Sequence, residues 1–129
     1  MTGKRAARAQ PALRVKRVYE PPAADDGRRI LVDRLWPRGL AKVKARIDVW
    51  LKDIAPSDAL RRQFHGHPDR FDDFCRAYAA ELDARPARAA VATLREQMAE
   101  GRVTLLFAAR DEAHNNAVAL RDWLTKTSD

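Results

Sequence analysis

The sequence contains a single cysteine, Cys75, so it can form neither an intramolecular disulfide nor a zinc site built on cysteines. No stretch approaches the roughly 18 apolar residues of a membrane-spanning helix, and no apolar segment follows the basic N-terminus as a secretory signal requires. A chain without disulfides suits a reducing compartment. We therefore expect a cytoplasmic protein without a membrane partner.

Four well-known sequence patterns are also absent. They are the glycine-rich phosphate-binding loop, the Gly-x-Gly-x-x-Gly dinucleotide loop, the Gly-x-Ser-x-Gly nucleophile elbow and the His-Glu-x-x-His zinc motif. Their absence argues against a P-loop nucleotidase, a dinucleotide oxidoreductase, an α/β-hydrolase esterase and a zincin.

What is present fits one globular domain behind a basic arm. The 129 residues include 46% hydrophobic ones, and a chain of this length can bury roughly two-thirds of its unfolded surface. The net charge of +7 is uneven, because six of the 25 Lys and Arg residues, and none of the 18 acidic ones, precede residue 18. We predict a basic, disordered arm at residues 1–12 and a single α/β domain at residues 13–129.

Two continuous apolar runs predict strands that are buried on both faces, as in parallel sheets. One is Ile30-Leu31-Val32 within residues 29–35, and the other spans residues 103–109 and is predicted to be central. Residues 13–19 are rich in strand-forming residues and end at two prolines, and residues 47–51 alternate between apolar and polar side chains.

Four helices are predicted from capping residues and from apolar side chains at helical spacing. They are expected after Ser57 as N-cap, from Phe71 to Leu82, between Pro86 and Gly101, and after Asp111 as N-cap. Strands that alternate with helices predict a single compact three-layer α/β domain, with a Rossmann-like, mostly parallel sheet flanked by helices.

The first polar cluster follows the first buried run and spans residues 33–39. Ligands of open parallel sheets bind beyond the carboxyl ends of the strands, which is where this cluster is expected. The planar guanidinium groups of Arg34 and Arg38 suit a carboxylate or a phosphate. Asp33 could orient an arginine or act as a second carboxylate, or it could form a structural ion pair with Arg34 or Arg110.

The second polar cluster, residues 110–115, follows the other buried run. Asp111 and His114 are three residues apart on the predicted first turn of a helix, so they are expected to lie close together. Asp111 could orient the imidazole for proton transfer. Alternatively, Asp111 only caps the helix and His114 is a polar residue of its first turn. If the strands are parallel and near one another, both clusters face the same edge of the sheet.

Other residues have a purely structural interpretation as well as a functional one. His65 and His67 could join His114 as three imidazoles, but no metal-ligand spacing is matched, so we expect no metal and no cofactor. Lys52 could reach an anion or be a solvated lysine of an extended edge. Trp36 could stack on a ligand ring, although aromatic residues beside apolar runs typically belong to the core.

Four blocks of the sequence follow a family pattern: Leu31 to Gly39, Trp50 to Ser57, Phe64 to Leu82, and Val103 to Asn115. On these blocks, over residues 14–125, the chain resembles the YeaO-like family, a bacterial family of domains of unknown function. The resemblance implies a compact α/β domain without an established activity. It also implies a polar set consisting of Asp33, Arg34, Trp36, Arg38, Lys52, Arg110, Asp111, His114 and Asn115.

The chain departs from the family pattern at two places. Phe107 stands where many members are expected to have tyrosine, so a hydroxyl group is missing there. More distant relatives are similar in placing a Cys-His-Arg triplet after the last strand. The nearest segment here is His114-Asn115-Asn116, which contains no thiol.

Three hypotheses for function follow from these features. In the leading one, the domain binds or acts on a small anionic ligand, with Arg34, Arg38 and Arg110 holding the anion and His114 transferring a proton. In the second, the basic arm binds nucleic acid through phosphate contacts without sequence preference. In the third, the domain is a non-catalytic interaction module. The substrate, the reaction and the oligomeric state are left open.

Overall fold

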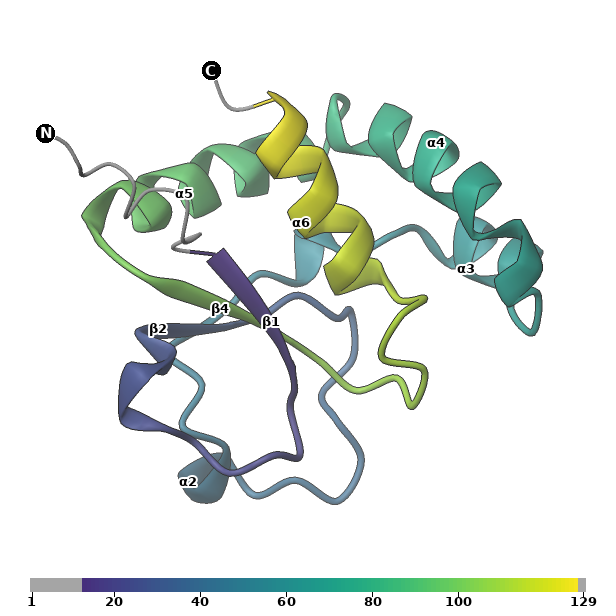
Figure 1. The fold of residues 1–129 in the computed structure, drawn as a ribbon. Helices are drawn as coiled ribbons and strands as arrows, with labels where there is room; N and C mark the ends of the chain where they lie inside the picture. The colour runs from purple at the N-terminus through teal and green to yellow at the C-terminus, as the bar shows by residue number, and fades with distance from the viewer. Residues whose placement is uncertain (1–12, 128–129) are drawn as a thin grey trace, which may run out of the picture.

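The sheet of the protein consists of four parallel strands in the order β1-β4-β2-β3. The computed structural model describes residues 13–127, so the predicted arm lies outside the described residues. The strands are β1 (Leu13–Arg17), β2 (Arg28–Leu31), β3 (Val49–Trp50) and β4 (Val103–Phe107) (Figure 1). β4 lies between β1 and β2 and is buried along its whole length, which confirms the predicted parallel sheet and the central position of this run.

The long helices pack on one face of this sheet (Figure 1). They are α3 (Asp58–Phe64), α4 (Phe71–Leu82), α5 (Ala87–Glu100) and α6 (Asn116–Thr127). Alternation along each strand directs Ile30, Leu105 and Phe107 into the core that these helices cover. The predicted α/β fold is therefore confirmed. No helix within residues 13–127 is long and apolar enough to cross a membrane.

The other face of the sheet is covered mainly by an irregular segment. Leu31 and Leu106 point to this face and pack with residues of the chain between 36 and 50. Between residues 36 and 50 the chain contains one helix, the one-turn α2 (Lys42–Ala45), and it ends in the short strand β3. Trp36 and Trp50 meet edge to face with ring centroids 5.5 Å apart. The tryptophans thus help to bury this face.

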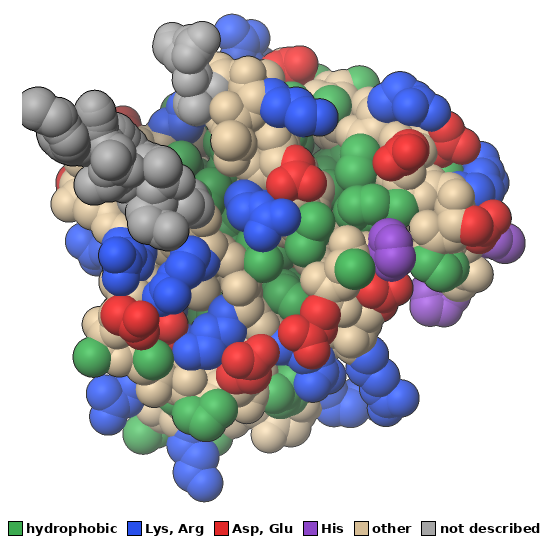
Figure 2. Space-filling model, in the orientation of Figure 1, with side chains coloured by type: hydrophobic (Ala, Val, Ile, Leu, Met, Phe, Trp, Pro, Cys, Tyr) green, Lys and Arg blue, Asp and Glu red, His purple; other side chains and the backbone are tan. Residues whose placement is uncertain are grey.

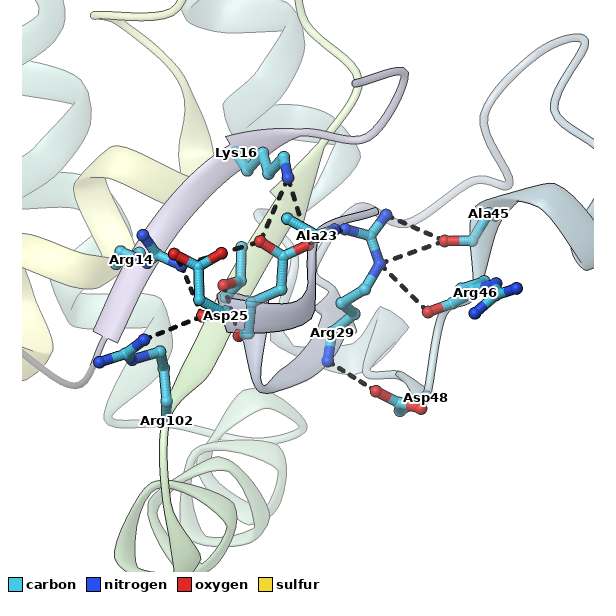
Figure 3. Close-up of polar contacts among 11 residues, drawn as sticks. Arg14, Lys16, Ala23, Asp25, Arg29, Ala45, Arg46, Asp48 and Arg102 are labelled. Atoms are coloured by element: carbon cyan, nitrogen blue, oxygen red, sulfur yellow. Dashed lines mark hydrogen bonds and ion pairs between the residues drawn. The ribbon is translucent and has the colours of Figure 1, made fainter. Parts of the chain in front are cut away.

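A buried ionic network ties the amino ends of the strands together. Asp26 ends the short 3-10 helix η2 (Ala24–Asp26), and its carboxylate accepts hydrogen bonds from Lys16 Nζ at 3.1 Å and from Arg29 Nη1 at 2.6 Å. Arg29 also donates to the carbonyl oxygens of Ala45 and Arg46, at the end of α2 (Figure 3). The network holds the loops at the edge of the sheet opposite to the polar clusters.

Two predicted boundaries differ from the structure. The strand predicted over residues 29–35 ends at Leu31, because the chain turns away at Asp33, whose side chain bonds to the end of β4. The last helix begins at Asn116, so Asp111 is not its N-cap. The cap is Asn115, whose Oδ1 accepts a hydrogen bond from the Val118 amide at 2.9 Å.

Candidate functional site

A pocket of about 680 Å³ opens beyond the carboxyl ends of β2 and β4. The segments that follow these two adjacent strands both line it, so the two polar clusters share one cavity, as expected for neighbouring parallel strands. Eight of the nine predicted site residues line the pocket: Asp33, Arg34, Trp36, Arg38, Arg110, Asp111, His114 and Asn115. Lys52 does not, because its Nζ lies over the Trp50 ring, 4.6 Å from the centroid.

The three histidines of the chain also line this pocket. They gather at the right of the view in Figure 2, among hydrophobic and acidic side chains. His65 and His67 come from the turn that follows α3, and His114 comes from the loop before α6. Nevertheless, within residues 13–127 no three His, Cys, Asp or Glu side chains are placed to hold a metal ion.

Asp33 is a brace between the ends of two strands and a helix. Its Oδ2 accepts a hydrogen bond from the Ala108 amide at 2.9 Å, and its Oδ1 accepts one from Asn116 Nδ2 at 3.1 Å. Burial raises the pKa of the Asp33 carboxyl above its usual value, although both hydrogen bonds and the positive charge of Arg61 act in the opposite direction. The structural ion pair of Asp33 with Arg34 or Arg110 is not formed. The carboxylate instead accepts hydrogen bonds from the Ala108 amide and from Asn116.

Asp111 and His114 form a compact turn before α6. Asp111 Oδ1 accepts hydrogen bonds from the Ala113 and His114 amides, each at 3.0 Å. His114 Nδ1 lies 3.0 Å from Asp111 Oδ2, and this hydrogen bond is the main cause that lowers the pKa of Asp111 below its usual value. The two side chains are therefore close, as predicted, but in a turn and not on a helix. A carboxylate at Nδ1 favours the ring form with hydrogen there and leaves Nε2 for another partner.

The arginines of the pocket have unused hydrogen-bond donors. The side chains of Arg38 and Arg110 are exposed and make no hydrogen bond or ion pair with the described part of the chain. Arg34 donates from Nη2 to the carbonyl oxygens of Ala55 and Pro56, both at 3.3 Å. Its buried Nε has no hydrogen-bond partner, since the Asp58 carboxylate lies 4.0 Å away.

Aromatic side chains form another wall of the pocket. Phe71 and Phe74 are stacked with ring centroids 5.9 Å apart, and Phe64 meets Phe74 edge to face at 5.8 Å. The ring of His114 stands edge-on to Phe71, with centroids 5.2 Å apart. The pocket therefore combines cationic and apolar surfaces, and His114 lies where the two meet.

Among the lining residues that were not predicted as site residues, three make contacts that shape the site. Asn116 Nδ2 donates hydrogen bonds to Asp33 Oδ1 and to the Val32 carbonyl oxygen. The positive charge of Arg61 acts to lower the pKa of Asp33. The Tyr19 hydroxyl donates to the Arg38 carbonyl oxygen at 2.8 Å and so fixes the rim. Asn116 directly follows a predicted site residue and was within reach of sequence analysis. The roles of Tyr19 and Arg61 depend on contacts that only the fold creates.

The basic residues of β1 are used within the fold. Arg14 contacts the carbonyl oxygen and the carboxylate of Asp25, and Lys16 pairs with the buried Asp26. Arg17 donates to the carbonyl oxygens that follow β4. The remaining basic residues of the segment, Lys4, Arg5 and Arg8, lie outside the described residues. Nucleic-acid binding through the arm stays a prediction.

A family model described as the inactive DUF488-N3 subclade matches residues 12–129. The chain belongs to this family. The predicted YeaO-like character is confirmed by an identity of 41% to the uncharacterized protein YeaO of Escherichia coli K12, over 112 residues that make up 87% of this chain and 96% of YeaO.

Similar relatives of this YeaO-like chain occur in mycobacteria. The uncharacterized proteins Rv3073c of Mycobacterium tuberculosis and Mb3100c of Mycobacterium bovis are each 44% identical over 112 residues, which is 87% of this chain and 92% of theirs. Comparison with solved structures gives no significant match.

Proposed function

We propose that the protein is a binding domain for a small anionic ligand that carries a phosphate or carboxylate group, held in the pocket beyond β2 and β4. The observation that carries the proposal is the presence of unused guanidinium donors in one cavity. Arg38 and Arg110 line the pocket without a side-chain partner within residues 13–127, and Arg34 Nε is buried there without a hydrogen bond.

The energetics of these donors favour an anion. A buried donor without a partner costs about 1–3 kcal/mol, and an anionic oxygen near Arg34 would recover that cost. Arginine binds phosphate and carboxylate groups through paired N–H bonds, which are stronger than bonds between neutral groups. Four arginines and two aspartates line the cavity, and one of the aspartates, Asp33, already accepts hydrogen bonds from Ala108 and Asn116.

Binding without turnover is the form of the proposal that we favour. The description of the matching family as inactive supports it. In this form, His114 offers Nε2 to the ligand while Asp111 fixes the ring through Nδ1. Proton transfer by His114, with Asp111 and Asp33, stays a prediction, and chemical change of a bound phosphate ester would support it.

The test is calorimetric titration of the whole protein with methyl phosphate at low ionic strength. We expect one saturable site, and a loss of about tenfold in affinity for Arg38→Ala and for Arg110→Ala, because each removes one charge-assisted contact. The matched control is Arg88→Ala, which removes an exposed arginine of α5 that does not line the pocket. Absence of binding, or equal losses in all three variants, would contradict the proposal.

A further inference from the structure

The pocket is much larger than a simple anion needs. At the roughly 30 Å³ that one water molecule occupies in the liquid, a phosphate with five heavy atoms takes up at most about 150 Å³. The cavity has about 680 Å³, which lies within the range of about 300–1,000 Å³ that is usual for sites of organic ligands. The volume beyond the anion is therefore available to an organic group.

The walls of that remaining volume are apolar and aromatic. Phe64 and Phe71 line the pocket and are only half-buried, so their ring surfaces are still partly open to it. Phe71 is held by stacking on Phe74 and by the edge-on contact with His114. Rings fixed in this way can contact a planar group at little cost in side-chain entropy, and aromatic pairs gain beyond the area that they bury.

Most of the large exposed hydrophobic side chains of the described residues line the same pocket. Within residues 13–127, three large hydrophobic side chains are exposed: Tyr19 at 40%, Leu35 at 68% and Val43 at 86%. Two of them, Tyr19 and Leu35, line the pocket. Leu35 lies in the chain between the arginines at positions 34 and 38, which also line the pocket. Covering Leu35 would remove its apolar surface from water, which favours binding in proportion to the area covered.

We propose that the ligand carries a planar aromatic ring next to its anionic group, with the ring covered by Leu35 and Phe71 while arginines hold the anion. The proposal rests on the proposed function, because the ring is assigned to the same ligand whose anionic group the arginines hold. The expected ligand is therefore a phosphate or carboxylate that carries an aromatic ring, and aliphatic anions of equal charge are expected to bind more weakly.

The experiment compares phenyl phosphate with methyl phosphate in calorimetric titrations of the whole protein. Both are monoesters with the same anionic group, and only one has a ring. We expect phenyl phosphate to bind about tenfold more tightly or better, because its ring buries apolar surface in the pocket. Leu35→Ala and Phe71→Ala should remove most of this preference, and Leu35→Ala should leave the affinity for methyl phosphate within about twofold.

The control variant is Val43→Ala, which shortens a side chain that is even more exposed than Leu35 and does not line the pocket. It should keep the full preference for phenyl phosphate. Since Leu35 is largely exposed, its variant tests the inference even if Phe71→Ala does not fold. Equal affinity for the two esters would overturn the inference and leave the proposed function standing. Binding of neither ester would overturn the proposed function itself.

Discussion

Replacing Asp33 by alanine should destabilise the domain measurably. The change leaves two donors without acceptors, the Ala108 amide, 2.9 Å from Oδ2, and Asn116 Nδ2, 3.1 Å from Oδ1. Hydrogen bonds to a charged group contribute about 1.5–3 kcal/mol each, but Asp33 is only half-buried and burial raises its pKa. After this discount we expect the free energy of unfolding to fall by about 2–4 kcal/mol.

Urea unfolding followed by tryptophan fluorescence measures this change. The dependence on pH gives a second check of the role of Asp33. Because the pKa is raised in the folded state above the ordinary value of 3.8, the contribution of this carboxyl is greatest at or below that value and falls as the pH rises through the folded pKa. The difference between the parent and Asp33→Ala should therefore be smaller at pH 7 than at pH 4.

The exposed Asp111 provides the control for this measurement. Asp111→Ala removes a carboxylate that also accepts two backbone amides, yet its unfolding midpoint in urea should barely differ from that of the parent. The account of Asp33 as a brace is refuted if Asp33→Ala costs less than about 0.5 kcal/mol, the range of ordinary surface substitutions.

Three further substitutions test the scaffold around the site. Asp26→Ala leaves the buried Arg29 without its carboxylate partner at 2.6 Å, and only the carbonyl acceptors of Ala45 and Arg46 remain, so it should cost about 3–5 kcal/mol in urea unfolding at pH 7. Burial would raise the pKa of Asp26, but hydrogen bonds outweigh it and lower the pKa below 3.8, so the ionic part of this contribution should be lost as the pH falls from 3.8 through the folded pKa. Gly27→Ala should cost about 2–5 kcal/mol, since φ is +68° and a Cβ would lie 2.3 Å from the Arg102 carbonyl oxygen; an unchanged melting temperature would contradict this. Asn115→Ala should cost about 1 kcal/mol through loss of the α6 cap, and an equal loss for Asn115→Asp would show that capping is not its role.

The fold was largely predictable from contiguous sequence. The apolar runs around Ile30 and Leu105 indicated buried parallel strands, and the spacing from Phe71 to Leu82 indicated a helix; both are present. The start of α6 was misplaced because Asp111 and Asn115 are both good caps by residue type. In the fold, Asp111 instead caps the preceding turn, through amides that a sequence cannot assign.

The site was predictable in its location but not in its contacts. Adjacent parallel strands bring residues 33–38 and 110–115 together, so a local pattern was sufficient to place both clusters at one edge. The partners of Asp33 are 75 and 83 positions away in the chain, and no local pattern joins them. The place of Lys52 outside the pocket depends likewise on a contact, because its Nζ lies over the Trp50 ring.

Titration of the isotope-labelled protein with phenyl phosphate shows directly whether an anion binds beyond β2 and β4. The backbone amide signals in NMR spectra report the binding residue by residue. Saturable shifts are expected to concentrate in the pocket segments, residues 33–38, 64–71 and 108–116. Signals of α5, which does not line the pocket, should stay in place. Unmoved spectra, or shifts confined to surfaces away from these segments, would contradict an anion site beyond β2 and β4.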